Sequence, residues 1–399
     1  MNFTIQVPEG TMNHGDPRIM CTPPTWRDYI TFFALNYFIH AATLPSVPGE
    51  TKREMTFAVL NALFVPGFGV SRAMRRLVLR PALRRKRHFD CALAAGALCM
   101  VVSDDTKYRP RSDNWANRTF SDDLLVLECP HTRRVHGRCK LPPDGGYILC
   151  VVPPGAKLEA LNPAAAPKDW VFEPGYEYNF VKILFSLVQA VAGGITVYRA
   201  RGDQIQQYGY GAFGLSVVPY IFMSVINIIA SFLCPEFPAM YLVHSPDMDD
   251  ASSKGGQFDG LVARLVVSEP GLSDDEKLEP EWVYQKGVNW LLVKGIFWLL
   301  LIFTPLIIVG GLSGFRTGEI STVAQRGWLM SWLVVGSLSS LWIVLVLSVG
   351  VRTPNAIHNH RWQVLGFGMS VLLLWAPAVG GMVTVGLELR DYGVCIRLD

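Results

Sequence analysis

The sequence predicts an α-helical polytopic membrane protein with about seven spans and a small mixed α/β extramembrane domain built from two loops. Half of its 399 residues are hydrophobic and 17% are charged. An average soluble domain has about 25% charged residues. The mean hydropathy is positive, and apolar residues gather in long blocks toward the C-terminus. Blocks of roughly 20 apolar residues match the thickness of a bilayer.

Five blocks reach, or nearly reach, the length of a spanning helix. They are Phe180–Tyr198, Ala212–Cys234, Val288–Val309, Trp328–Val349 and Leu365–Leu387. Three of them contain a proline, at Pro219, Pro305 and Pro377. Membrane helices tolerate proline because neighbouring groups satisfy the freed backbone.

Two weaker apolar segments, Tyr29–Leu44 and Thr56–Val70, precede these blocks. The turn Pro45–Gly49 joins them, so we expect a helical hairpin; a re-entrant or interfacial pair is the alternative, because both segments are short.

A basic run follows the hairpin and predicts contact with anionic lipid headgroups. The expected contact residues are Arg75, Arg76, Arg84, Arg85, Lys86 and Arg87. Because the adjoining sequence is apolar, we expect a lipid partner and no nucleic-acid partner.

Strand-like runs occur in both loops, and we expect them to pair into one domain. The runs are Leu98–Val102, Leu124–Glu128, Tyr147–Val152, Ala239–Val243 and Leu261–Val267. The predicted organisation is a polar N-terminal tail (1–27), a hydrophobic helical hairpin (28–71), a basic juxtamembrane segment (72–90), the first part of the loop domain (91–178), spans three and four (179–234), an acidic loop forming its second part (235–287), spans five to seven (288–389) and a C-terminal tail (390–399).

The side of the membrane on which the loop domain lies stays open. The apolar segment Cys91–Ser103 is only 13 residues long, so we favour seven spans and a cytoplasmic domain. Arginines near the other helix ends favour the reverse, which needs about eight spans and a lumenal domain with Asn117 as a glycosylation site. These arginines are Arg199, Arg201, Arg316, Arg326 and Arg390. The eight cysteines lack the dense spacing of a secreted disulfide scaffold, and the polar N-terminus predicts no signal peptide.

A candidate intramembrane polar site consists of Lys294, Gln189 and Asn227, which lie within predicted spans. Polar groups at this depth are costly unless paired, and they often mark ligand or ion paths. The lysine can instead extend its ammonium to the membrane surface, and the amides can hydrogen-bond between helices. Asn36 and His40 lie one turn apart and favour helix packing over a proton or metal role.

Cys129, His131, His136 and Cys139 offer two sulfur and two imidazole ligands, a set that can bind zinc. Their spacing matches no familiar finger, so a disulfide or unconnected surface residues are the alternatives. Motifs for metalloproteases, serine hydrolases and phosphate-binding loops are absent from the sequence. We therefore expect no cofactor and favour a non-enzymatic protein.

Several stretches resemble an uncharacterised family of fungal multi-span membrane proteins. The resemblance rests on Gly96–Val102, on Arg201–Gln204 with Tyr208–Leu215, and on Trp26–Tyr29 with Asn36, Tyr37 and His40. It implies a multi-pass membrane protein and assigns no functional residue. The function expected is movement of a solute or ion through the helical bundle, since prolines and polar groups interrupt the spans. The alternatives are a membrane scaffold or sensor acting through its loop domain and, third, a membrane-embedded enzyme.

Overall fold

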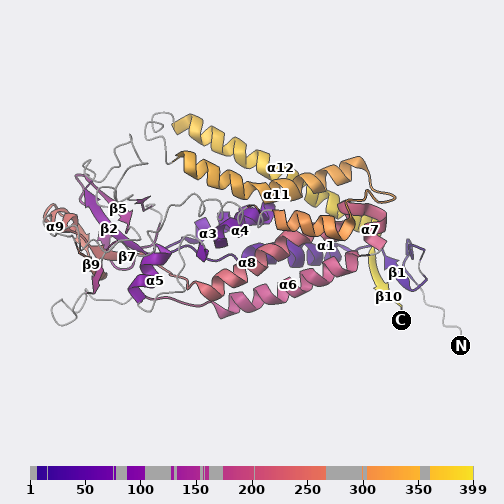
Figure 1. Cartoon of the computed structure of the whole chain (residues 1–399), viewed down its shortest axis with the longest axis horizontal. Helices are drawn as coiled ribbons and strands as arrows, with labels where there is room; N and C mark the ends of the chain where they lie inside the picture. Colours follow the sequence, from indigo (N-terminus) through magenta and orange to yellow (C-terminus); the bar gives the residue numbers. More distant parts are fainter. Residues whose placement is uncertain are drawn as a thin grey trace.

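The computed structural model is elongated, with helices along its long axis and a β-rich part at one end (Figure 1). Both chain ends lie at the opposite end of the bundle (Figure 1). The residues that the structure describes are 7–15, 17–74, 76–77, 88–103, 127–129, 133–152, 156, 158–160, 174–201, 203–266, 299, 303–350 and 360–398.

The N-terminal helices fold back on one another as a hairpin. The first helix begins at a capping box, in which Asp28 accepts a hydrogen bond of 2.7 Å from the backbone N–H of Thr25. A second box, formed by Thr51 and Glu54, starts the returning helix. The elements are α1 (Trp26–Phe33), the π-helix η1 (Ala34–Phe38), α2 (Ile39–Ala42), α3 (Lys52–Phe64) and α4 (Pro66–Met74).

The central hairpin of the bundle consists of two long helices, α6 and α8, that pack against each other. A compact connection joins them at the end of the bundle where the termini lie (Figure 1). The elements are α6 (Phe180–Ala200), α7 (Asp203–Tyr208), the 3-10 turns η6 (Gly209–Gly211) and η7 (Phe213–Val217), and α8 (Val218–Leu233). A short apolar helix (Phe303–Ser313) and two long helices, α11 (Val323–Gly350) and α12 (His360–Tyr392), complete the bundle.

Aromatic rings form the centre of the bundle core. The ring of Tyr37 lies 4.9 Å from that of Tyr220 and 5.6 Å from that of Trp332, measured between centroids. All three side chains are buried. The indole N–H of Trp332 donates a 2.9 Å hydrogen bond to the carbonyl of Phe64 at the end of α3. Burial of such large rings dominates the energy of a core, so this contact fixes η1, α3, α8 and α11 to one another.

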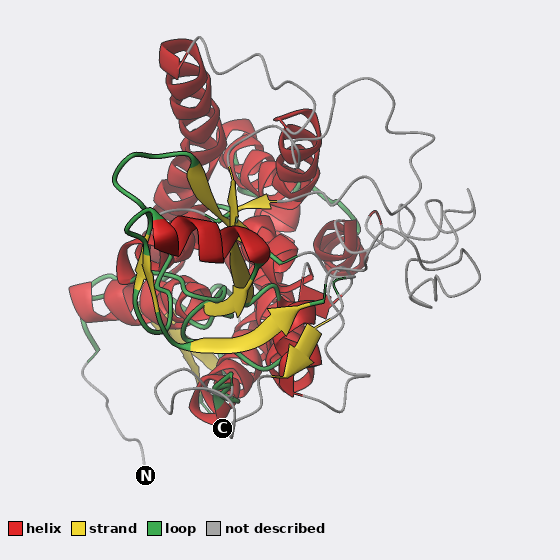
Figure 2. Cartoon of the chain, turned by 90° about the vertical axis from the view of Figure 1, so that its left-hand side faces the viewer, coloured by secondary structure: helices red, strands yellow, loops and turns green. Residues whose placement is uncertain are grey.

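The β-rich end contains a six-stranded mixed sheet of order β3-β5-β2-β7-β9-β6. In Figure 2, which looks onto this end, the strands and one helix lie in front of the bundle. Its strands are β2 (Leu98–Ser103), β3 (Leu127–Glu128), β5 (Tyr147–Val151), β6 (Leu158–Ala160), β7 (Tyr241–His244) and β9 (Leu261–Leu265). The flanking elements are α5 (His88–Ala95), α9 (Pro246–Ser253) and the ribbon of β4 (Cys139–Lys140) with β8 (Gln257–Phe258).

Strand pairing between the two loops is confirmed. Leu98 of β2 lies beside Tyr241 of β7 in parallel register, and Cys99 lies beside Val151 of β5 in antiparallel register. The predicted runs therefore form one sheet in which β2 joins strands from both loops.

The chain ends meet at the far end of the bundle. Strands β1 (Ile19–Thr22) and β10 (Val394–Arg397) form an antiparallel ladder. Cys21 and Cys395, opposite each other in this ladder, form a disulfide across 374 residues of sequence. No sequence pattern had predicted this pairing.

The prediction of a seven-span polytopic fold, and the eight-span variant with it, is wrong. Within the described residues, two helices are long and apolar enough to cross a membrane, Phe180–Ala200 and Phe213–Leu233. The first predicted hairpin segment, Tyr29–Leu44, lies in α1, η1 and α2, and the second, Thr56–Val70, is divided between α3 and α4, which have 13 and 9 residues. Their buried residues, such as Ala62 and Val70, contribute to the bundle core. Hydropathy counts apolar residues, but it does not distinguish those covered by protein from those covered by lipid.

Candidate functional site

A polar seam runs inside the bundle where α2, α6 and α8 meet. His40 of α2 is fully buried, and its Nδ1 lies 2.6 Å from the hydroxyl oxygen of Ser224 on α8. On α6, the buried residues Ser186, Gln189 and Gly193 recur three or four positions apart and therefore share one helix face. We call the set His40, Gln189, Ser224 and Asn227 the polar seam.

The antiparallel register of α6 and α8 brings the two amides of the seam to one level. Gly193 packs against Ile221, and Gly214 packs against Ala200. Moving forward along α6 therefore corresponds to moving backward along η7 and α8. Gln189 consequently lies at the level of Ser224 and Asn227. The prediction that Lys294, Gln189 and Asn227 form one intramembrane site stays a prediction, because Lys294 lies outside the described residues.

Five polar atoms of the seam accept or donate no hydrogen bond within the described part of the chain. They are Nε2 of His40 and both polar side-chain atoms of Gln189 and of Asn227. Each of these side chains is at least nine-tenths buried. Burying an unpaired polar group costs about 1–3 kcal/mol, so packing alone gives no reason to retain three of them in an apolar bundle.

Gly193 allows α6 to approach the seam closely. A Cβ at this position would lie 2.7 Å from Cγ1 of Ile221 and 3.4 Å from Nε2 of His40. The neighbouring Gly194 has no atom within 4 Å of such a Cβ. The two glycines are therefore a matched pair: an added side chain at Gly193 would meet packed atoms, whereas one at Gly194 would meet open space.

We expect Gly193→Ala to lower the free energy of unfolding by about 1–3 kcal/mol, the usual cost of overpacking. Gly194→Ala should instead raise it by about 0.5–1 kcal/mol, because alanine favours a helix. Thermal unfolding of the purified chain in detergent measures both. Equal effects of the two substitutions would contradict the close packing of α6 on α8.

A second group of polar side chains continues from the seam toward the chain ends. The Tyr37 hydroxyl lies 2.7 Å from that of Ser216. Glu388 of α12, one turn before the end of that helix, is fully buried, and neither carboxylate oxygen accepts a hydrogen bond of normal geometry from the described residues. Burial raises the pKa of Glu388 to about 9, although the backbone N–H of Phe213 opposes this. The carboxyl is therefore protonated at neutral pH.

The π-helix η1 directs residues of the N-terminal hairpin into this interior. Asn36 and Tyr37 of η1 are buried, as is His40 one turn later. The amide oxygen of Asn36 accepts a 3.0 Å hydrogen bond from the Thr196 hydroxyl on α6. π-turns inside α-helices are rare and occur frequently at functional sites. Here the turn contributes the side chains that link the seam to Ser216.

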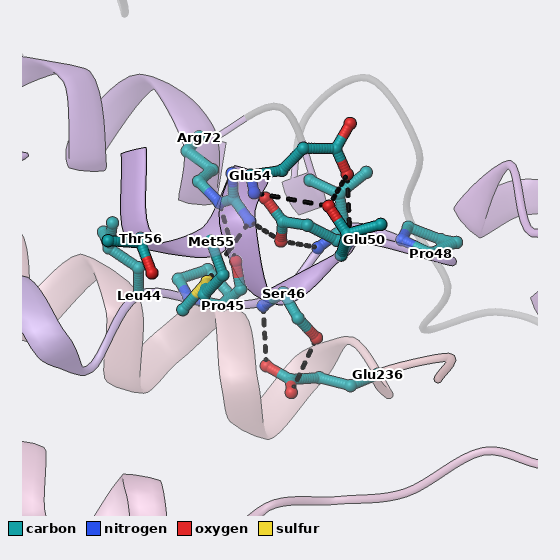
Figure 3. A network of polar contacts seen from close by, with 12 residues as sticks. Leu44, Pro45, Ser46, Pro48, Glu50, Glu54, Met55, Thr56, Arg72 and Glu236 are labelled. Carbon is teal, nitrogen blue, oxygen red and sulfur yellow. Dashed lines mark hydrogen bonds and ion pairs between the residues drawn. The ribbon is translucent and has the colours of Figure 1, made fainter. Parts of the chain in front are cut away.

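A charged hub closes the other end of the seam, next to the β-rich part. Glu236, just after α8, accepts hydrogen bonds of 3.1 Å and 2.9 Å from the backbone N–H and hydroxyl of Ser46 (Figure 3). The Lys182 ammonium lies 3.2 Å from both carboxylate oxygens, and a guanidinium nitrogen of Arg76 lies 3.5 Å from one of them. Beside the hub, Arg72 forms an ion pair with Glu50 (Figure 3).

Two cations of the hub, Lys182 and Arg76, face one carboxylate, that of Glu236. Although burial acts to raise it, the pKa of Glu236 is lowered by Lys182, by Arg76 and by the hydrogen bonds from Ser46. Burial lowers the pKa of Arg76, but a guanidinium stays protonated at neutral pH. Arg76 also donates hydrogen bonds of 2.6 Å and 2.9 Å to the carbonyls of Pro235 and Cys234. We call Glu236, Lys182, Arg76 and Ser46 the charged hub.

Of the sequence-predicted site residues, Gln189 and Asn227 lie in the seam, whereas Lys294 lies outside the described residues. Arg76, expected at lipid headgroups, points into the charged hub. The other expected headgroup contacts, Arg75, Arg84, Arg85, Lys86 and Arg87, lie outside the described residues, as does Asn117.

The proposed zinc set is described only in part. His131 lies outside the described residues. Cys129 is buried at the sheet, Cys139 lies on β4, and both are thiols. The His136 ring packs 5.4 Å from that of Tyr241. Among the described residues, three metal-ligand atoms converge elsewhere, at His14, Cys21 and Cys395, and the two cysteines there form the disulfide.

Sequence reasoning missed Glu388 and Glu236. Glu388 directly follows the predicted span Leu365–Leu387, so it was assigned to the end of a helix, whereas α12 continues to Tyr392. Glu236 lies at the start of an acidic loop and has no distinguishing neighbour in sequence. The signal available for both was a carboxylate immediately beside an apolar block.

Comparison with known proteins finds no matching family model, no matching curated protein and no matching solved structure. The resemblance to fungal membrane proteins stays a prediction, and fungal origin is not shown.

Proposed function

We propose that the hairpin of α6 and α8 lies in a lipid bilayer and that the polar seam beside it moves protons. The single observation that carries the proposal is the group of buried, unpartnered polar atoms on His40, Gln189 and Asn227. Buried polar side chains at membrane depth are costly and mark ion or proton paths. The carboxyl, phenol, hydroxyl and imidazole groups that follow one another in this bundle are those that exchange protons.

The outer face of α6 supports contact with lipid. Leu184, Val188, Val191 and Ile195 recur every three or four residues, and each is about half exposed or more. Exposed apolar faces of this length mark membrane or partner contacts. The 21 residues of α6 span about 31 Å, close to the hydrocarbon thickness of a bilayer. Exposed tyrosines at both ends, Tyr178 and Tyr198, suit the two membrane interfaces.

Arrangement along the bundle supports a proton path in preference to passage of a larger solute. The charged hub lies at the β-rich end, the seam lies in the middle, and Ser216, Tyr37 and Glu388 lie toward the chain ends. The His40 and Tyr37 side chains both pack against Tyr220, with ring centroids 6.4 Å and 4.9 Å away. A densely packed interior of this kind suits transfer between neighbouring groups, which needs no open channel.

Proton uptake by vesicles tests this function. The full-length chain is reconstituted into liposomes that contain a pH-sensitive dye, and uptake is driven by a potassium gradient with valinomycin. We expect faster uptake than in protein-free liposomes. His40→Gln keeps a hydrogen-bonding group beside Ser224 but cannot take up a proton, so it should lower the rate about tenfold, or about 1.4 kcal/mol. The surface variant Glu319→Gln should match wild type. Wild-type uptake no faster than that of protein-free liposomes would refute the proposal.

A further inference from the structure

The ladder of β1 and β10 brings a histidine and two cysteines together next to the chain ends (Figure 1). One ligand atom each from His14, Cys21 and Cys395 lies within 4.8 Å of the other two. In a tetrahedral zinc site, neighbouring sulfur and nitrogen ligand atoms are about 3.5–3.8 Å apart. The three side chains are therefore close to the arrangement that one metal ion requires.

A short loop carries His14 to the ladder. Met12 and Cys21 exchange backbone hydrogen bonds of 2.9 Å and 2.8 Å, which close this loop. His14 has a φ of 49°, in the left-handed region that is uncommon outside glycine but enriched in histidine. Its ring stacks on that of Tyr392, with centroids 4.6 Å apart. A disulfide between the chain ends requires only two cysteines, so the disulfide does not explain the placement of the histidine.

The contacts of the imidazole suit it to bind a metal. Nε2 of His14 lies 2.9 Å from the carbonyl oxygen of Tyr392, and because a carbonyl only accepts, this nitrogen carries the hydrogen. Nδ1 of the neutral ring then keeps the lone pair that a metal binds. Metal-binding histidines usually donate their other N–H to a carbonyl or carboxylate in this way, which fixes the ring. His14 and Cys395 are both partly exposed, so an ion can reach them from solvent.

We propose that His14, Cys21 and Cys395 bind a zinc ion when their disulfide is reduced. A dithiol reductant supplies two electrons and two protons, the S–S bond breaks, and the reductant leaves as its own disulfide. Zinc then displaces one proton from each thiol, and two thiolates, the imidazole and a water complete its tetrahedral shell. The chain ends are therefore joined covalently in an oxidising environment and by the metal in a reducing one. This site is independent of the proposed proton path.

Alkylation of individual cysteines tests the site in the full-length chain. The protein is purified in detergent, reduced with a phosphine, freed of reductant without oxygen, and treated with iodoacetamide in the presence or absence of zinc sulfate. Mass spectrometry follows Cys21 and Cys395 separately, so zinc bound by other cysteines does not affect the reading. We expect zinc to slow both reactions at least tenfold and a chelator to restore them. Equal rates with and without zinc would overturn the proposal.

His14→Gln tests the third ligand. The oxidised variant should retain the bond between Cys21 and Cys395, which verifies that its chain ends still meet. After reduction, zinc should protect these cysteines at least tenfold less than in wild type. The matched control is His244→Gln, because His244 lies on β7 at the β-rich end, 2.9 Å from Asp249, and this variant should be protected as wild type is. Undiminished protection in His14→Gln would overturn the three-ligand site.

Discussion

Replacing Glu388 by glutamine is expected to stop proton movement and, at the same time, to stabilise the folded chain at neutral pH. Glutamine has nearly the shape of a protonated carboxyl but cannot release a proton, so uptake should fall to the rate of protein-free liposomes. The stability gain has a separate cause. Because burial raises the pKa of Glu388 from 4.5 to about 9, the folded chain holds a proton that the unfolded chain has released between these values.

The sign of the pH dependence follows from this difference. Where the unfolded state binds fewer protons than the folded state, stability falls as pH rises. Wild type should therefore lose stability steadily from about pH 5 to pH 9, and the variant should not. At pH 7 the advantage of Glu388→Gln is about 3 kcal/mol, at about 1.4 kcal/mol for each pKa unit. Thermal unfolding in detergent between these pH values measures it, with Glu319→Gln as the surface control. A constant gap between wild type and variant would contradict burial of the carboxyl.

Replacing Glu236 by glutamine should cause a large loss of stability. Lys182 and Arg76 both direct their charges to this carboxylate, and the side chains of all three are less than one-fifth exposed. Removing one partner of a buried ion pair leaves uncompensated charge and costs about 3–5 kcal/mol. The pKa of Glu236 is lowered, so its contribution is complete above pH 4.5, the usual carboxyl value, and is lost as pH falls through the folded pKa.

A matched exposed pair separates this effect from simple loss of charge. Asp250 and Lys254 form an ion pair of 3.0 Å with both side chains more than half exposed. Asp250→Asn should leave the melting temperature unchanged, since exposed pairs contribute little. The variant Glu236→Gln should melt earlier at pH 7 and should converge with wild type in acid. Equal melting temperatures at pH 7 would show that the hub is not a determinant of stability.

The elements that could be predicted from the sequence are those whose signal lies in residues close together along the chain. Strand runs such as Leu98–Val102 are apolar and bounded by turn residues, and their lengths agree with β2, β5, β7 and β9 to within a few residues. Gln189 and Asn227 were selected as candidates because they are the only amides within the apolar blocks Phe180–Tyr198 and Ala212–Cys234. Both inferences use neighbouring residues only.

The parts that could not be predicted depend on packing between distant segments. Whether protein covers an apolar side chain depends on which distant segments pack over it: Tyr37 and Trp332 are buried, whereas Leu184 on α6 is 61% exposed. The predicted number of membrane spans was wrong for this reason. Arg76 belongs to a basic run, yet its partner Glu236 is 160 positions away in sequence and is brought close by α8. The pairing of Cys21 with Cys395 is similarly invisible until both chain ends are placed at one end of the bundle.

The junction of β1 and β10 also has a mechanical consequence. A force that pulls the two chain ends apart acts first on the ladder Ile19–Arg397 to Thr22–Val394 and then on the covalent bond between Cys21 and Cys395. The segment enclosed by that bond, from Thr22 to Val394, carries no tension while the bond stays intact. A single-molecule pulling experiment on the termini should therefore release only the short tails outside the bond. Adding a reducing agent should lengthen the extension abruptly, as the helices and the sheet come under load for the first time.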